Sequence, residues 1–129
     1  MGLEAGQKLE LRVTPDRYVT IRYAGASGDF NPIHIDEQFA QAVGLPGRIL
    51  HGLWSMAQVA RAATDAAGGD PLALSELSVQ FRGLGRPEQE IIITGSVDTV
   101  DGGVASVKLE ARQGDSRLIR GAVARLRAG

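Results

Sequence analysis

The spacing of apolar and polar residues divides the chain into a helical part and an extended part. Residues 52–67 form the longest helical segment, with polar Ser55, Gln58 and Arg61 at three-residue intervals and apolar, alanine-rich positions between them. A helix that is apolar on most sides is buried on most sides. We therefore predict a buried central helix that ends at the GGDP sequence of residues 68–71, because glycine and proline stop helical structure.

From residue 74 onward the period of the pattern changes to two, which is typical of strands with one buried face. The predicted extended segments are 74–82, 90–100, 103–112 and 117–127. The turn sequences DGG and QGD separate the last three segments, so we expect a four-stranded antiparallel meander, with a further strand at 8–14. The expected fold is α+β, with a curved antiparallel sheet of about five strands wrapped around the central helix, in a single domain of residues 1–129.

Two shorter helices are predicted before the central one. The first begins with Thr14 as its N-cap and ends at Gly25 or Gly28. The second covers residues 37–43, with Asp36 as its N-cap.

Composition and charge narrow the function classes. The chain of 129 residues has 43% hydrophobic and 22% charged residues and a formal net charge of −1, which is ordinary for a globular protein. Basic residues are scattered and no apolar run reaches about 20 residues, so neither nucleic acid nor a membrane is an expected partner. The chain has no cysteine, which excludes disulfides, thiolate metal sites and a cysteine nucleophile. No signal peptide is recognisable, and a cytoplasmic location is expected.

The candidate chemistry lies in the stretch YAGASGDFNPIHIDEQFA. Pro32 favours an extended Asn31, so only a turned loop can bring Asp29 and His34 together. A carboxylate and an imidazole that share one water molecule suit general acid–base catalysis, because histidine titrates near neutral pH. Two other interpretations remain open. Asp29 and Asn31 are turn residues only, or a metal ion is held by Asp29, Asn31, His34 and Asp36.

The stretch ILHGLWSM places Gly52 at the start of the predicted central helix. The first N–H groups of a helix have no partner within the helix, and the helix dipole favours negative charge there. A glycine at this position lets a ligand carbonyl approach such an N–H closely. The alternative is that Gly52 only permits close packing of the helix against the sheet. Trp54 and Met56 are expected in the core rather than in a pocket.

Together these stretches resemble the hydratase-2 motif of MaoC-like, (R)-specific enoyl-thioester hydratases and 3-hydroxyacyl-thioester dehydratases. The resemblance is unbroken from Tyr23 to Ala40 and continues at the HG sequence of residues 51–52. It implies the hotdog fold, a long central helix wrapped by an antiparallel sheet, which agrees with the periodicity. The chain departs from the family pattern at Ala60, where some members carry a serine, and in the glycine-rich segment 81–90.

The resemblance also implies roles for individual residues. The catalytic groups are expected to be Asp29, His34 and the N–H of Gly52. The substrate-binding residues are expected to be Asn31, His51 and Arg82, with no metal and no cofactor. The implied reaction is reversible addition of water to a trans-2-enoyl thioester of coenzyme A or acyl carrier protein, which gives an (R)-3-hydroxyacyl thioester. Such a reaction belongs to fatty-acid or polyhydroxyalkanoate metabolism.

Several alternatives remain at this point. Hotdog thioesterases usually carry a carboxylate on or beside the central helix, where this chain has only Asp65, near the far end. The chain is expected to form a homodimer through its exposed sheet edges, or to be the catalytic subunit of a heterodimeric dehydratase. Arg48, Arg82 and Arg86 are either candidates for phosphate contacts or ordinary solvated side chains.

Overall fold

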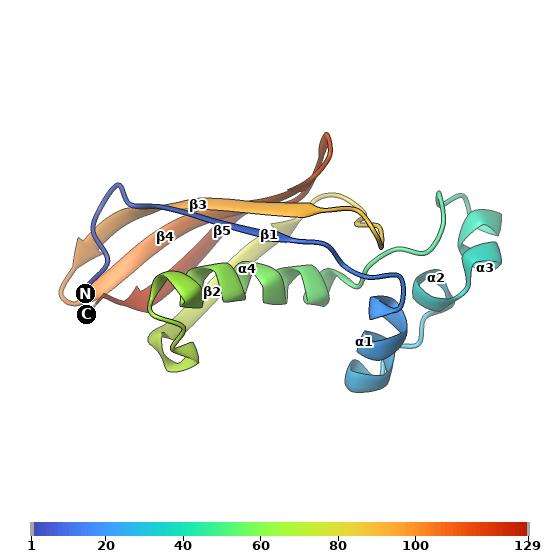
Figure 1. Cartoon of the computed structure of the whole chain (residues 1–129), viewed down its shortest axis with the longest axis horizontal. Helices are drawn as coiled ribbons and strands as arrows, with labels where there is room; N and C mark the ends of the chain where they lie inside the picture. Colours follow the sequence, from blue (N-terminus) through green and yellow to red (C-terminus); the bar gives the residue numbers. More distant parts are fainter. Residues whose placement is uncertain (1, 129) are drawn as a thin grey trace.

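The computed structural model describes residues 2–128 and consists of one twisted antiparallel sheet with a long helix along one face (Figure 1). The strands are β1 (Lys8–Val13), β2 (Leu74–Phe81), β3 (Ile91–Asp101), β4 (Val104–Gln113) and β5 (Ser116–Arg127). The helices are α1 (Val19–Ser27), α2 (Pro32–Ile35), α3 (Glu37–Ala42) and α4 (Gly52–Ala66), followed by a 3₁₀ turn, η1 (Pro71–Ala73). The three short helices α1, α2 and α3 gather beside the start of α4 (Figure 1). None of the described helices has the length and apolar content that crossing a membrane requires.

The order of the strands differs from the predicted meander. The sheet runs β1-β3-β4-β5-β2, so β2 pairs with β5 at one edge and not with β3. Tight turns join β3 to β4 and β4 to β5, where Gly102, Gly103 and Gly114 adopt positive φ. The segment 82–90 contains no such hairpin and carries the chain across to β3, which pairs with β1. Alternation identified the strands correctly, but it carries no information on which strands are neighbours.

The hydrophobic core forms where α4 contacts the inner face of the sheet. Val59, Ala62 and Ala63 of α4 are buried together with strand residues such as Ile93 and Val107. Because two of these helical side chains are alanines, the helix can lie close to the sheet. Trp54 and Met56 are partly buried against this core, as predicted.

Helix α4 is less enclosed than its composition predicted. Ser55, expected on an exposed polar stripe, is buried, whereas Leu53 is 61% exposed. Ala57 is also exposed. The sheet covers one side of the helix only, so part of the apolar surface of α4 faces outward in the single chain. The predicted helix of 52–67 otherwise agrees with the observed bounds.

Helix α1 begins later than predicted. Thr14 is not its N-cap, because the helix starts after Tyr18. Pro15 is buried ahead of the helix, and its carbonyl accepts a hydrogen bond from the N–H of Glu88 at 2.6 Å. This contact with a distant loop overrides the local preference for an early helix start. Gly28, one of the two predicted ends, terminates α1 with a φ of 80°.

The start of α1 carries a contact that depends on pH. The Arg22 guanidinium donates a hydrogen bond to Asp16 at 2.6 Å, which is the main reason that the pKa of Asp16 lies below its usual value. A lowered pKa stabilises the fold above the unfolded-state pKa, and this contribution is lost as the pH falls through the folded-state pKa. Asp16→Asn is therefore expected to lower the Tm slightly at pH 7, and progressively less as the pH falls below about 4.

Thermal unfolding followed by circular dichroism at several pH values tests this expectation. Asp101→Asn is the matched control, since Asp101 is exposed at the end of β3. A Tm difference for Asp16→Asn that is the same at pH 7 and at pH 2 would contradict the role of the Asp16 charge.

Candidate active site

The loop between α1 and α3 is shaped by two successive side-chain-to-backbone hydrogen bonds. Oδ1 of Asp29 accepts from the N–H of Asn31 at 3.2 Å, and Oδ1 of Asn31 accepts from the N–H of Ile33, also at 3.2 Å. The second bond caps α2, a helix of four residues that begins at Pro32 and that the sequence analysis missed. These Asx-type turns are the reason that the chain bends sharply between Asp29 and His34.

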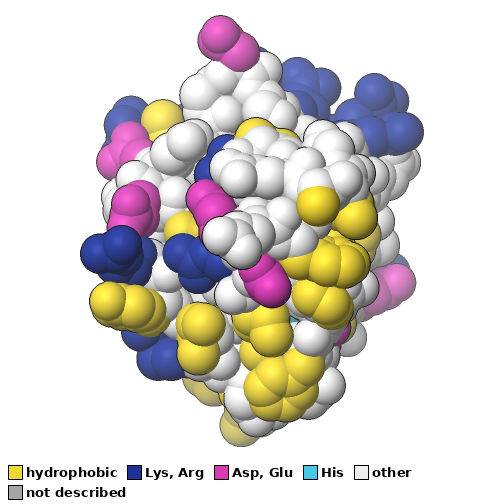
Figure 2. Space-filling model, turned by 90° about the vertical axis from the view of Figure 1, so that its right-hand side faces the viewer, with side chains coloured by type: hydrophobic (Ala, Val, Ile, Leu, Met, Phe, Trp, Pro, Cys, Tyr) yellow, Lys and Arg dark blue, Asp and Glu magenta, His cyan; other side chains and the backbone are white. Residues whose placement is uncertain are grey.

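Asp36 completes the loop as predicted, since its Oδ1 accepts from the N–H of Phe39 at 3.1 Å and caps α3. The short helices of this region expose several apolar side chains beside charged ones at the end of the molecule (Figure 2). The exposed apolar residues of this region include Tyr18, Ile21, Phe30, Phe39 and Val43. The candidate site therefore opens beside an unusually apolar surface.

Asp29 and His34 face one another, as the sequence predicted. Nε2 of His34 lies 3.8 Å from Oδ2 of Asp29, which is longer than a direct hydrogen bond and short enough for one shared hydroxyl or water to bridge. The Asp29 side chain is 52% exposed and that of His34 only 10% exposed. Asp29 is therefore open to solvent, whereas the His34 side chain is largely buried.

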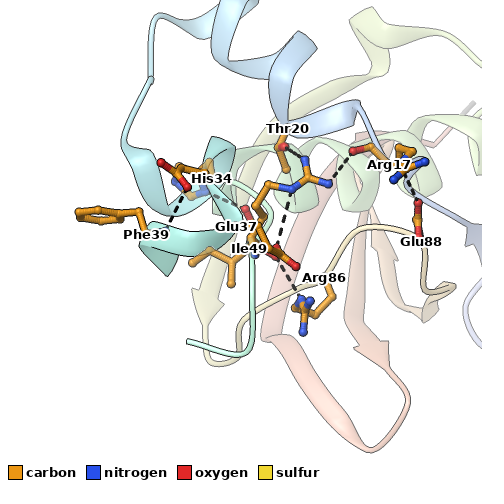
Figure 3. Close-up of polar contacts among 10 residues, drawn as sticks. Arg17, Thr20, His34, Glu37, Phe39, Ile49, Arg86 and Glu88 are labelled. Carbon is orange, nitrogen blue, oxygen red and sulfur yellow. Dashed lines mark hydrogen bonds and ion pairs between the residues drawn. The ribbon is translucent and has the colours of Figure 1, made fainter. Parts of the chain in front are cut away.

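The tautomer of His34 follows from its second contact. Nδ1 of His34 lies 2.8 Å from the carbonyl oxygen of Ile49. A carbonyl can only accept, so Nδ1 carries the hydrogen and Nε2 of the neutral ring has a free lone pair. That lone pair is on the side of Asp29. Figure 3 shows His34 and Ile49 near one another.

His51, expected to bind substrate, packs against the His34 ring. Its ring is stacked on the His34 ring, with centroids 3.8 Å apart and planes 19° apart, and the Tyr23 ring lies 4.8 Å away. Nε2 of His51 lies 3.0 Å from the carbonyl oxygen of Asp29, to which it donates. The residue is only 3% exposed, so the side chain lies behind the pair, and its expected contact with a substrate stays a prediction.

Gly52 begins α4 and borders a pocket of about 180 Å³. The pocket is lined by His34, Ile49, Leu50, Gly52, Ser55, Phe81, Gly83, Leu84, Gly85 and Leu118. A Cβ atom at Gly52 would lie 3.2 Å from the Phe81 ring, so the glycine keeps this wall of the pocket open. The N–H of Gly52 belongs to the first turn of α4, where backbone donors lack intrahelical partners. Both suggested roles of the glycine, close packing and N–H donation, are compatible with this position.

The three candidate arginines have different surroundings. Arg82 is exposed, and its Nη2 donates to Gln80 at 3.0 Å. Arg48 and Arg86 are instead engaged inside the protein, because Nε of Arg86 donates to the carbonyl of Arg48 and the Arg48 guanidinium donates to Thr20. Arg48 and Arg86 are thus neither fully solvated nor free of contacts within the chain, and a phosphate contact of either residue stays a prediction.

The residues that could hold a metal ion differ from the predicted set. Asp29, His34 and His51 can each offer one ligand atom, and these atoms all lie within 4.8 Å of one another. Asp36 does not join this group, since its carboxylate caps α3, and Asn31 uses its Oδ1 to cap α2. A set of two imidazoles and one carboxylate is chemically suited to zinc or iron, but the acid–base arrangement described above requires no metal.

A larger groove of about 770 Å³ lies on the face of the sheet turned away from α4, near Lys8, Lys108 and Arg120. Its one carboxylate, Glu110, lies 3.7 Å from Arg117. His34 lines the α4 pocket and His51, the other histidine of the chain, is stacked on it, so the groove has no carboxylate–imidazole pair. Because the Asp29–His34 pair lies beside the smaller pocket, we take that pocket as the candidate active site.

Some site residues had no usable signal in the sequence. Tyr23 lies inside the recognised stretch, but only the fold shows that its ring flanks His51. Phe81 is 51% exposed at the end of β2, and it borders the pocket because β2 lies beside α4. The close approach of Phe81 to Gly52 is a long-range contact that no local pattern could predict.

Comparisons with known proteins find relatives that match parts of the chain. The chain is 32% identical over 117 residues, 88% of its length, to the fatty acid synthase beta subunit aflB of Emericella nidulans, and spans 5% of that protein. It is 37% identical over 73 residues, 56% of its length, to the peroxisomal enoyl-CoA hydratase 2 of Arabidopsis thaliana, and spans 23% of that protein. The chain thus matches only a small part of these curated relatives.

The fold has close counterparts among solved structures. The unliganded R-hydratase PhaJ1 from Pseudomonas aeruginosa matches with a TM-score of 0.84 and 22% identity, over 98% of this chain and 82% of that chain. This likeness confirms the expected hotdog fold. The family model described as "MaoC like domain" matches residues 2–116, and the chain therefore belongs to the MaoC-like domain family.

Proposed function

We propose that the protein is a hydro-lyase that interconverts trans-2-enoyl thioesters and (R)-3-hydroxyacyl thioesters. The observation that carries the proposal is the Asp29–His34 pair, 3.8 Å apart, with His34 also lining the pocket that begins at Gly52. Membership of the MaoC-like family supports it, as does the similarity to an enoyl-CoA hydratase 2. In this proposal Asp29 and His34 act as the acid and base, and the Gly52 N–H is the oxyanion donor.

In the hydration direction, a water molecule between Asp29 and His34 attacks C3 of the enoyl thioester. One proton of this water passes to the pair, and the pair delivers a proton to C2. The electrons of the C2–C3 double bond shift toward the thioester oxygen, whose growing negative charge accepts a hydrogen bond from the Gly52 N–H. One such donor contributes about 3 kcal/mol and positioned acid–base groups about 10²–10⁴-fold, so both are needed for an enzymatic rate.

The acyl chain is expected to occupy the pocket beyond Gly52. Leu84, Leu118 and Phe81 make this part of the lining apolar, which suits the burial of methylene groups. The thioester carrier would lie outside, toward the exposed side of Asp29. Among the arginines considered for a carrier phosphate, Arg82 is the one that remains exposed.

The proposal is tested by incubating the purified protein with crotonyl-CoA and following the loss of the enoyl absorbance. We expect hydration, with (R)-3-hydroxybutyryl-CoA as the product in a chiral assay. A product of (S) configuration, or no hydration of any enoyl-CoA from C4 to C16, would contradict it. Activity that requires a second, related chain would instead identify this chain as the catalytic subunit of a heterodimer.

A thioesterase is the second candidate function, and the geometry disfavours it. The carboxylate on α4 that such an enzyme would use is Asp65, which lies near the C-terminal end of the helix and 3.9 Å from Arg61. It does not line the pocket that contains Gly52. Release of free thiol from the same enoyl-CoA, measured beside hydration, separates the two activities.

We also propose that two copies of the chain associate through the edge formed by β2. The strands β1 and β2 lie at the two edges of the sheet. The charges of Lys8, Glu10 and Arg12 alternate along β1, which discourages pairing at that edge. Phe81, the last residue of β2, is exposed, and so is Leu53 on α4. Association through the β2 edge would therefore cover apolar surface. Sedimentation velocity distinguishes a dimer from a monomer.

A further inference from the structure

Arg48 lies in the segment that connects α3 to α4, and its side chain is only 20% exposed. Nη1 of Arg48 donates to the hydroxyl of Thr20 at 3.1 Å, and Nη2 donates to the carbonyl of Arg17 at 3.0 Å. Thr20 is itself buried in α1. The guanidinium therefore joins the α3–α4 segment to α1, and Figure 3 shows Arg17 and Thr20 together on that side of the cluster.

The backbone of Arg48 is held from two further directions. Its N–H donates to Oε1 of Glu37 on α3 at 2.6 Å. Its carbonyl accepts from Nε of Arg86, in the loop between β2 and β3, at 3.1 Å. The Glu37 carboxylate also lies 3.9 Å from the Arg48 Nε. Arg48 is consequently fixed by both its side chain and its backbone.

The residue after Arg48 is the one that holds His34. The N–H of Ile49 donates to the carbonyl of Ile33 at 3.1 Å, and the carbonyl of Ile49 accepts from Nδ1 of His34 at 2.8 Å. Between Arg48 and this carbonyl lie only one planar peptide group and the two backbone dihedrals of Ile49, so the Arg48 contacts help to set the path of the backbone at Ile49. The position of the His34 acceptor thus depends on the Arg48 contacts.

We infer that Arg48 is a positioning residue for His34, acting through the Ile49 carbonyl. This inference rests on the proposed function, in which His34 is a catalytic residue. Two nitrogens of the guanidinium donate to acceptors of α1 and the segment before it, and the third lies 3.9 Å from the Glu37 carboxylate, so the group is occupied by contacts within the chain. Without the guanidinium, the Ile49 carbonyl keeps its neighbouring backbone hydrogen bonds to Ile33 and Gly85 but is positioned less firmly, and the imidazole can then adopt the other tautomer and turn its lone pair away from Asp29.

The test uses Arg48→Met, which keeps most of the side-chain length but has no donor, in the full chain. For crotonyl-CoA hydration we expect kcat to fall by at least about tenfold, because small misplacement of a catalytic group is costly to rate. KM is expected to change less than about threefold, since Arg48 does not touch the substrate. Arg125→Met is the matched control, at an exposed arginine paired with Glu76 on the sheet, and should retain wild-type rates.

A spectroscopic readout separates positioning from a general loss of stability. The chain has two histidines, so ¹⁵N spectra of the imidazoles can be assigned with single variants. The wild-type protein should show His34 with its hydrogen on Nδ1, and Arg48→Met should show a mixture of tautomers. Arg48→Lys keeps the charge, but a single ammonium group cannot donate to Thr20 and Arg17 with the geometry of the guanidinium. Its kcat and its His34 tautomer ratio should lie between those of the wild-type protein and those of Arg48→Met.

The outcomes divide clearly. Wild-type kcat together with an unchanged His34 tautomer in Arg48→Met would overturn the inference. If Arg48→Met does not fold, Arg48→Lys and Thr20→Val, which removes the buried acceptor, are measured in the same way. If the wild-type protein hydrates no enoyl-CoA, the proposed function fails, and the tautomer spectrum alone decides whether Arg48 positions His34.

Discussion

Asp29→Asn and His34→Asn are each expected to lower crotonyl-CoA hydration by at least about 100-fold, the usual contribution of a positioned acid–base group. Asparagine at position 29 keeps the Oδ1 acceptor for the Asn31 N–H, so the loop can hold its shape while losing the charge. Asparagine at position 34 keeps an amide donor for the Ile49 carbonyl but removes the group that exchanges protons. His34→Ala, which removes both, should show at least the same loss.

Initial rates with crotonyl-CoA, measured beside far-ultraviolet circular dichroism, check this expectation. Asp65→Asn is the matched control, because Asp65 lies on α4 outside the pocket and contacts only Arg61 among its charged neighbours. It should retain the wild-type hydration rate. Near-normal activity of either Asp29→Asn or His34→Asn would reject the assignment of the pair, while loss of thiol release in Asp65→Asn would favour a thioesterase.

Gly95→Ala is expected to destabilise the fold by about 1–3 kcal/mol, the range measured when a well-packed core is overfilled. A Cβ atom at Gly95 would lie 2.6 Å from the Lys108 carbonyl oxygen and 2.9 Å from Cγ of Leu109. The first of these atoms belongs to the backbone of the paired strand β4, so relief requires the ladder itself to move. Leu109 is buried and has little freedom to withdraw.

Urea denaturation of Gly95→Ala and Gly25→Ala measures the effect against a matched substitution. Gly25 lies in the exposed part of α1, and a Cβ atom there would meet no atom within 4 Å. Alanine is a better helix former than glycine by about 1 kcal/mol, so Gly25→Ala should leave stability unchanged or raise it. Equal effects of the two substitutions would show that Gly95 is not required by the close approach of β3 and β4.

Local signals account for the parts of the fold and site that could be predicted. Asn31 and Pro32 specify the turn that brings Asp29 to His34, because their preferences act over neighbouring residues. The start of α4 at Gly52 and the cap at Asp36 follow from similar short-range rules. The alternation of β3, β4 and β5 was equally visible, since each strand has one buried face.

The remaining features depend on contacts between residues distant in sequence. Thr14 lost its predicted role as a helix cap because Pro15 is held by Glu88, more than seventy positions further along the chain. The pairing of β2 with β5 depends on the path of the loop 82–90, whose glycines and proline indicate a loop but not its direction. Arg48 looked like any surface arginine, because only the fold brings Thr20 and Arg17 to its guanidinium.

Ile49 connects the shape of the bound acyl group to the speed of its conversion. Its side chain forms part of the pocket wall, and its carbonyl holds the His34 ring. A chain that is too long or branched would push this wall outward and shift the imidazole with it. Poorly fitting acyl groups should therefore bind and yet turn over slowly, so that selectivity appears in kcat at saturating substrate.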